Sequence, residues 1–483
     1  MDNNEEAYQT PFSVTLDSVL IKTSRYFTAF QIAPIVSELS IYEHLDKPYL
    51  TASMVVADVD AKFDAASEIN ILGTERVEVE YSVSSAANGK VKKNFIVSEV
   101  SRQAKDVSGN EVMFIEMIED HAYRSSLMRV SKSYRDTRRN IIDKLILTTG
   151  RRIRSHDEML DHDDKITRVL VPNMTPLQAA NWVKDSMTTE DGYPFYMYST
   201  IADDVIRLYD LKTMLELQPL NKALNSRAGL DAHFTFSQFH DFADDTRSDS
   251  RATILNMLTI TKLNVVQDQR QLHLARQGMT RSKYNFFDVT TGKNTKVDFS
   301  MAKVFSDLET KGLLKDNSNF SVPQLSPTYD QTVRLDEDNI LTNNYEGDEY
   351  MTREITQFST SRQFNDYYDT RSYSEARTAQ QHENKIKSTA LRHWLLKSSM
   401  DIVCGGKFFV HTNRNHTIGN KISVVVKSSR NFEASTDFNQ TIDLNKSGEY
   451  LVYSAKHTIS GNQSYKVELT LAKLGGLTSG ASI

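Results

Sequence analysis

The feature that most constrains the fold is a strict alternation of polar and apolar side chains near residue 80. In Arg76-Val77-Glu78-Val79-Glu80-Tyr81-Ser82-Val83 every second residue is apolar, which is the pattern of a half-buried β-strand. Asn88-Gly89 follows, and this pair readily adopts the positive φ angles of a tight hairpin turn. Phe95-Ile96-Val97 then begins another strand. The pattern predicts antiparallel hairpins in this part of the chain.

Further strand patterns surround this hairpin. Val112–Ile118 is largely apolar on both faces and predicts a central strand. Phe12–Ile21 and Tyr49–Ala57 predict two more strands, and Phe63–Asn70 predicts a short helix. We therefore expect residues 1–120 to form a compact sheet or barrel with one helix.

The rest of the chain divides where its pattern changes. At 483 residues it is too long for one ordinary core. Ala122–Leu147 is rich in helix formers, Thr175-Pro176 is a well-formed helix start, and strand patterns follow at Phe195–Tyr198 and Val205–Tyr209. The expected domains are 1–120, a β domain; 121–225, an α/β insert; 226–312, a second β-rich domain; 313–385, an extended polar arm with scattered aromatic rings; 386–474, a helix plus β domain; and 475–483, a flexible tail.

Charge and cysteine content limit the function classes. With 57 Lys and Arg against 63 Asp and Glu, the formal net charge is −6, so the whole chain attracts neither a phosphate backbone nor an anionic membrane. The single cysteine, Cys404, cannot form an internal disulfide and is expected in the core, which fits a reducing cytoplasm. Met1–Glu6 is polar and acidic, unlike a signal peptide. No apolar stretch reaches the roughly 18–20 residues of a membrane span.

The short motifs of common enzymes are missing from the sequence. It contains no Gly-x-x-x-x-Gly-Lys-[Ser/Thr] or Gly-x-Gly-x-x-Gly phosphate loop and no Gly-x-Ser-x-Gly elbow. His382-Glu383 begins a zinc-peptidase motif, but Ile386 stands where the second histidine ligand belongs. We therefore assign no catalytic residue and no cofactor.

Two groups of acidic residues have side chains of the kind found in metal or glycosidase sites. His156–Asp164 is dense in possible metal ligands but lacks the calcium-loop spacing, so a charged surface loop is favoured and no metal ligand is assigned. Paired acids of a glycosidase would need two carboxylates across a cleft. Asp241, Asp244 and Asp245 are the nearest candidates, and a surface turn is the better interpretation.

A basic cluster follows residue 120. A solvated helix face or a contact with an acidic neighbouring subunit explains it, with direct phosphate binding as the alternative. The candidate partner-docking face consists of Arg135, Arg138, Arg139, Arg151 and Arg152.

The order of these parts, together with three groups of segments, resembles the baseplate hub proteins of contractile-tailed bacteriophages and, more distantly, the hub part of type VI secretion spikes. One group is a helix followed by aromatic strands: Asn173–Trp182, Gly192–Tyr198 and Ile206–Leu211. Another is the opening pair of segments, Tyr42–Val59 and Arg76–Val79. The third is a C-terminal pattern of a Gly-x-x-Ile strand, a Ser-Gly-x-Tyr-x-Val strand and a later histidine: Gly419, Ile422, Ser447, Gly448, Tyr450, Val452 and His457.

The resemblance implies a fold and an assembly. The fold would be α+β and strand-rich, with two tail-tube-like β-barrel domains (1–120 and within 386–474), a helix-containing insert and an accessory β domain. Three copies would form a homotrimer whose six barrels make a pseudo-sixfold ring around the channel. Implied partners are the central spike, tail tube or tube-initiator proteins, the tape measure protein and other baseplate proteins, with DNA only in transit and no membrane. The location would be the virion tail baseplate, after assembly in the host cytoplasm.

Two other function classes remain open from the sequence. A tail-associated cell-wall hydrolase would need a cleft holding a carboxylate of raised pKa. A carbohydrate-binding tail fibre or adhesin would need aromatic platforms. Trp182 and Trp394 both fall on predicted helix faces, where packing is the favoured role, and 21 tyrosines keep the adhesin in consideration.

Overall fold

The computed structural model describes the parts of the chain from which the fold follows. They are residues 14–23, 29–58, 63, 71, 73–83, 90–102, 111–155, 167–221, 236–237, 257–267, 276–279, 281–288, 292, 294–311, 353–359, 375–395, 398–410, 417–426, 443, 446–461 and 464–473. Among these residues, no helix combines the length and the apolar character needed to cross a membrane.

The N-terminal half of the main sheet is a run of antiparallel strands with the order β3-β4-β7-β6-β5-β1-β2. Its strands are β1 (Thr15–Lys22), β2 (Ala29–Gln31), β3 (Val36–His44), β4 (Thr51–Asp58), β5 (Arg76–Ser82), β6 (Lys90–Arg102) and β7 (Glu111–Glu119), with the 3-10 helix η1 (Ala33–Ile35) before β3. In β5 the side chains of Val77, Val79 and Tyr81 are buried, so the strand predicted from the alternation is confirmed. Its apolar face lies on the core because successive side chains point to opposite faces.

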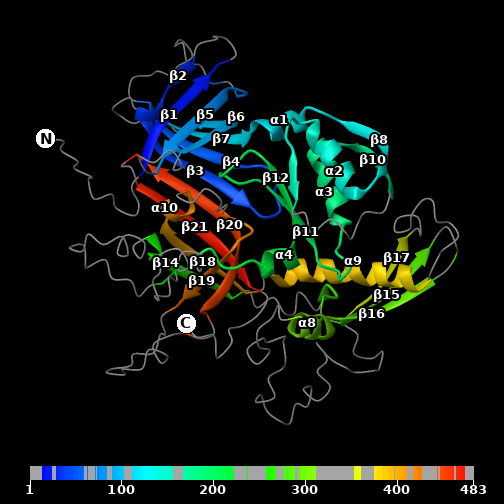
Figure 1. Ribbon diagram of the computed structural model, residues 1–483. Coiled ribbons are helices and arrows are strands. Elements are labelled where there is room, and N and C mark those ends of the chain that lie inside the picture. The colour runs from blue at the N-terminus through cyan, green and yellow to red at the C-terminus, as the bar shows by residue number, and fades with distance from the viewer. Residues whose placement is uncertain are drawn as a thin grey trace, which may run out of the picture.

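The C-terminal half of the same sheet comes from strands that follow the insert in the sequence, between residues 236 and 473. Its order is β14-β18-β21-β20, with β19 on β20 and β13 parallel to β19. The elements are β13 (Phe236–Ser237), β14 (Lys262–Gln267), β18 (Ser398–Gly405), the helix α10 (Lys407–Val410), β19 (Lys421–Val425), β20 (Gly448–Ser460) and β21 (Ser464–Lys473). Because β20 also pairs with β3, the described strands of both halves form one 13-stranded sheet (Figure 1).

The insert lies between the halves in sequence and has a core of its own. Its elements are α1 (Asp120–Ser126), β8 (Val130–Asp136), α2 (Arg138–Leu147), β9 (Ile153–Ser155), β10 (Thr167–Met174), α3 (Pro176–Asp185), β11 (Phe195–Tyr198), β12 (Ile206–Asp210) and α4 (Leu211–Glu216). Ile141, Leu145 and Val183 are among the residues of this core. Thr175 caps α3 in a capping box with Gln178, and Pro176 opens the helix, as its sequence predicts.

A smaller accessory sheet completes the described fold. It consists of β15 (Arg281–Asp288), β16 (Asn294–Ser300) and β17 (Arg353–Ser359), with β15 between the other two, beside α8 (Met301–Thr310) and α9 (Glu375–Leu395). In Figure 1 this sheet lies at one end of α9, away from the main sheet. The interval 226–312 thus supplies strands to both sheets, and the interval 313–385, expected as a polar arm, supplies β17 and the start of α9.

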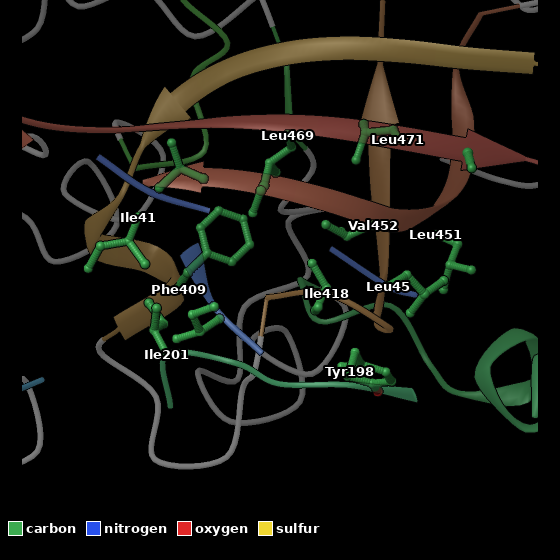
Figure 2. Close-up of a cluster of buried hydrophobic side chains, with 14 of the residues drawn as sticks. Ile41, Leu45, Tyr198, Ile201, Phe409, Ile418, Leu451, Val452, Leu469 and Leu471 are labelled. Atoms are coloured by element: carbon green, nitrogen blue, oxygen red, sulfur yellow. The ribbon is translucent and has the colours of Figure 1, made fainter. Parts of the chain in front are cut away.

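The main core is formed jointly by the two sheet halves and the insert. Figure 2 shows Ile41 and Leu45 of the N-terminal half facing Val452, Leu469 and Leu471 of the C-terminal half. Tyr198 and Ile201 of the insert enter the same cluster. The expectation of a strand-rich fold is confirmed, and the strands gather in one large, mostly antiparallel sheet. Cys404 is fully buried within this core, and burial raises the pKa of its thiol to about 12.

Candidate assembly site at the junction of the sheet halves

Strand β20 is the element that holds the two sheet halves together. On one edge it pairs with β21 along nearly its whole length, from Leu451↔Ala472 to Ser460↔Ser464. On its other edge it pairs first with β19 and then, from Ser454↔His44 to Ser460↔Glu38, with β3. The second half of β20 therefore forms a continuous antiparallel ladder between segments more than 400 residues apart in the sequence.

A buried polar cluster lies under this ladder. Glu43 of β3 and His457 of β20 have fully buried side chains, and Nε2 of His457 lies 3.4 Å from Oε2 of Glu43. On the other side of the ring, Nδ1 of His457 lies 2.7 Å from the hydroxyl of Tyr465 in β21. A carboxylate can only accept hydrogen bonds. This favours the histidine tautomer with its proton on Nε2, toward Glu43, and Nδ1 accepting from Tyr465.

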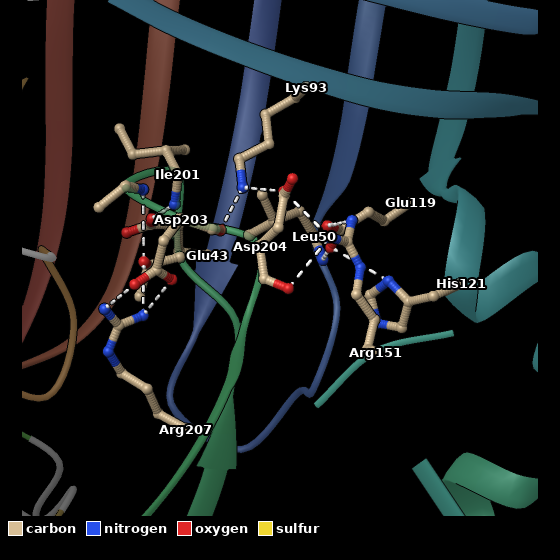
Figure 3. Close-up of polar contacts among 12 residues, drawn as sticks. Glu43, Leu50, Lys93, Glu119, His121, Arg151, Ile201, Asp203, Asp204 and Arg207 are labelled. Atoms are coloured by element: carbon tan, nitrogen blue, oxygen red, sulfur yellow. Dashed lines mark hydrogen bonds and ion pairs between the residues drawn. The ribbon is translucent and has the colours of Figure 1, made fainter. Parts of the chain in front are cut away.

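The same carboxylate connects the insert to the junction. Glu43 Oε1 accepts a hydrogen bond of 2.5 Å from the backbone N–H of Ile201. Figure 3 shows Ile201 approaching Glu43 from the insert. Nearby, Arg207 donates to both carboxylate oxygens of Asp203, at 2.8 and 2.6 Å, which fixes the loop that carries Ile201. One buried acid therefore contacts both sheet halves and the insert.

A second polar cluster fastens the insert to the N-terminal half. The Lys93 side chain is 2% exposed, and its Nζ donates to the Asp203 carbonyl at 2.5 Å and to Asp204 Oδ1 at 3.1 Å. Arg151 donates to Glu119 Oε1 at 2.9 Å and to the Asp204 carbonyl at 3.0 Å (Figure 3). Burial opposes ionisation of Asp204, but the charges of Lys93 and Arg151 outweigh it and lower the pKa of that carboxyl.

His121 closes this second cluster. Its Nε2 lies 2.8 Å from the Pro48 carbonyl, which can only accept, so Nε2 carries the proton. Its Nδ1 lies 3.7 Å from Glu119 Oε2 without a hydrogen bond, and that oxygen accepts from the Leu50 N–H. Burial is the main cause that lowers the pKa of His121, against the opposing charge of Glu119. The ring is therefore held neutral at neutral pH.

The glycine and serine residues of the C-terminal sequence pattern have structural roles. Gly419 has φ +75°, and a Cβ there would lie 2.3 Å from the Tyr198 hydroxyl, so only glycine allows this approach of the insert. The hydroxyl of Ser447 accepts from the Val426 N–H at 2.8 Å and donates to the Asp443 carbonyl at 2.7 Å. Gly448 follows with φ +133°.

The remaining residues of that pattern pack or bond within the C-terminal half and the junction. Ile422 and Val452 are fully buried. The Tyr450 hydroxyl donates to the Lys446 carbonyl at 2.5 Å, and Lys473 Nζ lies 4.9 Å from the centre of the Tyr450 ring. His457 is the histidine of the buried junction cluster. The pattern thus marks the pairing of β19 with β20 and the contact of β20 with β3.

The five arginines of the candidate docking face occupy different environments. Arg135 and Arg152 are exposed and Arg139 is half-buried. Arg138 is only 9% exposed, because it lies on the inward side of α2. Arg151 is turned inward to Glu119. The exposed part of this basic surface is therefore centred on Arg135, Arg139 and Arg152.

The described residues contain no cluster of three or more His, Cys, Asp or Glu arranged to hold a metal ion. His382, which begins the incomplete zinc-peptidase motif, is buried. Its ring stacks on the ring of Phe286, with the two ring centres 3.7 Å apart. The runs His156–Asp164 and Asp241–Asp245 lie outside the described residues. Trp394 is buried, as expected for packing, whereas Trp182 is 45% exposed on α3.

Sequence reasoning missed Glu43 and Lys93, and a usable signal existed for Glu43. In Leu39-Ser40-Ile41-Tyr42-Glu43 the two-residue period of the strand places Glu43 on the same face as Leu39 and Ile41, both fully buried. An acid at a core position needs a buried partner. Such a position is a detectable sign of a polar junction.

Comparison with known proteins finds similarity among solved structures. No protein-family model matches the chain, and no curated protein is similar to it. The chain is similar to the tail protein from Neisseria meningitidis MC58 (12% identity, TM-score 0.49, covering 96% of this chain and 97% of that one). It is also similar to the 43 kDa tail protein of prophage MuSo2 from Shewanella oneidensis (9%, TM-score 0.49, 95% and 98%).

A third similarity is to the E. coli c3393 protein, a component of the type VI secretion system with structural similarity to T4 tail proteins gp27 and gp5 (10%, TM-score 0.37, 92% and 76%). The solved structures to which the chain is similar thus include phage tail proteins and a type VI secretion component, the kinds of protein that its sequence resembles.

Replacing His457 by Phe should destabilise the junction. Glu43 and the Tyr465 hydroxyl would each lose a buried partner, at about 1–3 kcal/mol per group. The free energy of unfolding, measured in urea, should fall by that order. Lys456→Ala, one residue away on the opposite face of β20, should change it by less than about 0.5 kcal/mol.

A double variant tests the contact between Glu43 and His457. Because the two side chains touch, His457→Phe combined with Glu43→Leu should lower the free energy of unfolding by less than the sum of the two single effects. Strict additivity would contradict the cluster.

His121 should make the free energy of unfolding depend on pH. Its pKa is lower in the folded protein than the ordinary 6.5, so below pH 6.5 the unfolded chain binds the proton first and stability falls as pH falls. The variant His121→Gln keeps an amide that can donate to the Pro48 carbonyl but cannot take up this proton. Its free energy of unfolding should therefore fall less steeply with falling pH, the difference being at most about 1.4 kcal/mol per pH unit. Thermal unfolding between pH 7.5 and 5 measures it, with exposed His393→Gln as control. An unchanged slope in His121→Gln would count against this assignment.

Proposed function

We propose that this chain is a structural, non-catalytic hub protein of a contractile phage tail. In this proposal the N-terminal and C-terminal halves of the main sheet are the two tail-tube-like barrels. Three copies form a homotrimeric ring that joins the central spike to the tail tube and surrounds the channel for tape measure and DNA. The protein would be part of the virion baseplate and would assemble in the host cytoplasm.

The observation that carries the proposal is the β3–β20 ladder with its buried cluster. It fixes the two sheet halves in one unit, and in this proposal each half is one tube-like building block of the ring. Three such chains would present six blocks in a ring, which matches a threefold spike to a sixfold tube. Closed rings of this kind arise when identical chains contact each other head to tail.

The positions of the residues that carry the resemblance support a structural role. The residues that resemble hub proteins close strand pairs or fill the core, as Gly419 and Ser447 do. The buried acid Glu43 is used in internal bonding, to the Ile201 N–H and beside His457. The proposal also agrees with the tail proteins among the similar solved structures.

The insert is the proposed docking element for the other baseplate proteins. In Figure 1 its helices α2 and α3 and the β8–β10 pair lie to one side of the main sheet. Its exposed Arg135 and Arg152 favour an acidic partner. Trp182, exposed on α3, is of the residue type most enriched among energetically dominant interface contacts.

The mass of the protein in solution tests the proposed ring. The chain has a mass of 55.0 kDa, so light scattering should give three times this value, alone or after addition of the spike protein of the same tail. Negative-stain images of that sample should show a ring with a central hole. A monomer both alone and with the spike, or a clearing of cell-wall suspensions by the monomer, would overturn the proposal.

Charge reversal tests the proposed docking surface. The double variant Arg135→Glu/Arg152→Glu should weaken binding to a purified acidic baseplate protein of the same tail by at least about tenfold, as two attractive charges become repulsive. The affinity of the unaltered chain should fall with added salt. Lys303→Glu, which reverses an exposed charge on α8, is the matched control and should bind normally. Equal binding by all three proteins would exclude this surface.

A further inference from the structure

The outer face of the accessory sheet carries a polar depression that the proposed hub role does not use. The depression has a volume of about 420 Å³ and is lined by Asn285, Phe287, Asn294, Lys296, Glu354 and Thr356. Every lining residue comes from β15, β16 or β17. Side chains of alternate residues share one face of a sheet, and the register places Asn285 opposite Lys296 on one neighbour and Thr356 on the other.

The opposite face of this sheet is fixed by packing. Tyr284 and Phe286 are buried and stacked on each other, with ring centres 6.0 Å apart. Phe286 in turn stacks on His382 of α9, and Val297 and Phe299 complete the buried face. The side chains of the depression therefore stand on a rigid support, which keeps the entropy cost of binding low.

Asn285 forms the floor of the depression. Its side-chain Nδ2 donates to Glu354 Oε1 at 2.6 Å, and this bond fixes the orientation of the amide. The residue is 9% exposed, and in the described part of the chain its Oδ1 has no hydrogen-bond donor. A buried acceptor without a donor is costly, so this floor favours a hydroxyl group or water above it.

The rim mixes donors and acceptors around one aromatic ring. Lys296, Asn294, Thr356 and Glu354 are exposed and together offer ammonium, amide, hydroxyl and carboxylate groups. Phe287, 37% exposed, adds an apolar ring beside them. One lysine and one glutamate leave the lining without net charge.

These properties select a class of ligand. A sugar hydroxyl both donates and accepts, so it can satisfy amide, carboxylate and ammonium groups at once, while its C–H face can lie on an aromatic ring. A phosphate or acidic sugar would be attracted by Lys296 but repelled by the Glu354 carboxylate of the same lining, so a negative charge gains little there. An apolar peptide side chain would leave the polar rim unsatisfied. We propose that this depression binds a neutral saccharide, of the size of one or two sugar units.

This site is independent of the proposed ring, because none of its residues belongs to the main sheet or the insert. It gives the carbohydrate-binding function considered from the sequence a location that uses neither tryptophan. On a tail it would let the chain contact neutral glycans of a cell surface.

Ligand-observed NMR on the full chain tests the inference. Neutral mono- and disaccharides of glucose, galactose, mannose and N-acetylglucosamine are the probes, and at least one should give saturation-transfer signals and a measurable Kd. Phe287→Ala and Thr356→Val should each weaken that Kd at least about fivefold. Asp298→Asn lies on the same face of β16 but does not line the depression, and it should bind normally.

Thermal unfolding of each variant separates loss of binding from loss of the fold. Weaker binding in Phe287→Ala and Thr356→Val at unchanged melting temperature, with Asp298→Asn unaffected, supports the site. No neutral saccharide binding, binding that the two variants leave unchanged, or preference for an anionic sugar or a peptide overturns it. Because light scattering on the same samples reports the trimer, failure here is distinguishable from failure of the hub proposal.

Discussion

Strand β20 is the element on which the rest of the structure depends. It spans Gly448–Ser460, and its two parts pair with different neighbours on the same edge, first β19 and then β3. Side-chain contacts under the ladder add to this backbone pairing. Nδ1 of His457 lies 2.7 Å from the Tyr465 hydroxyl, and its Nε2 lies 3.4 Å from Oε2 of Glu43.

The insert contacts the same buried cluster. Glu43 contacts it through the Ile201 N–H, and Lys93 and Arg151 hold the neighbouring aspartates from the other side. The Lys93 side chain is almost completely buried, whereas the Asp204 side chain is 61% exposed, so solvent reaches one partner of this ion pair. Arg151 is turned inward to Glu119, whereas Arg135 and Arg152 are exposed on the surface. Neighbouring charges of one basic cluster thus lie in two different environments.

The sequence predicted the elements with strong local signals and missed those decided by distant pairing. The alternation at Arg76–Val83 and the Thr175-Pro176 cap are readable within one segment, and both elements occur as expected. The Ser447-Gly448 and His457 positions were recognised as a pattern, but their partners, Val426 and Glu43, were not. The parallel pairing of β17 with β15 joins residues about 70 positions apart and has no local signature. Arg151 was grouped with surface arginines because inward and outward charges look alike in sequence.

Helix α9 links the accessory sheet to the insert. Asn384 donates to the Glu190 carbonyl at 2.7 Å, and Arg392 donates to Asp185 Oδ1 at 2.6 Å and to the Phe195 carbonyl at 2.9 Å. Gly192, with φ +82°, allows the helix to approach, because a Cβ there would lie 3.1 Å from Asn384 Cα. Phe286 of the accessory sheet stacks on His382 of the same helix. The accessory sheet is therefore attached to the insert through α9, and the insert itself contacts the junction through the Ile201 N–H and Glu43.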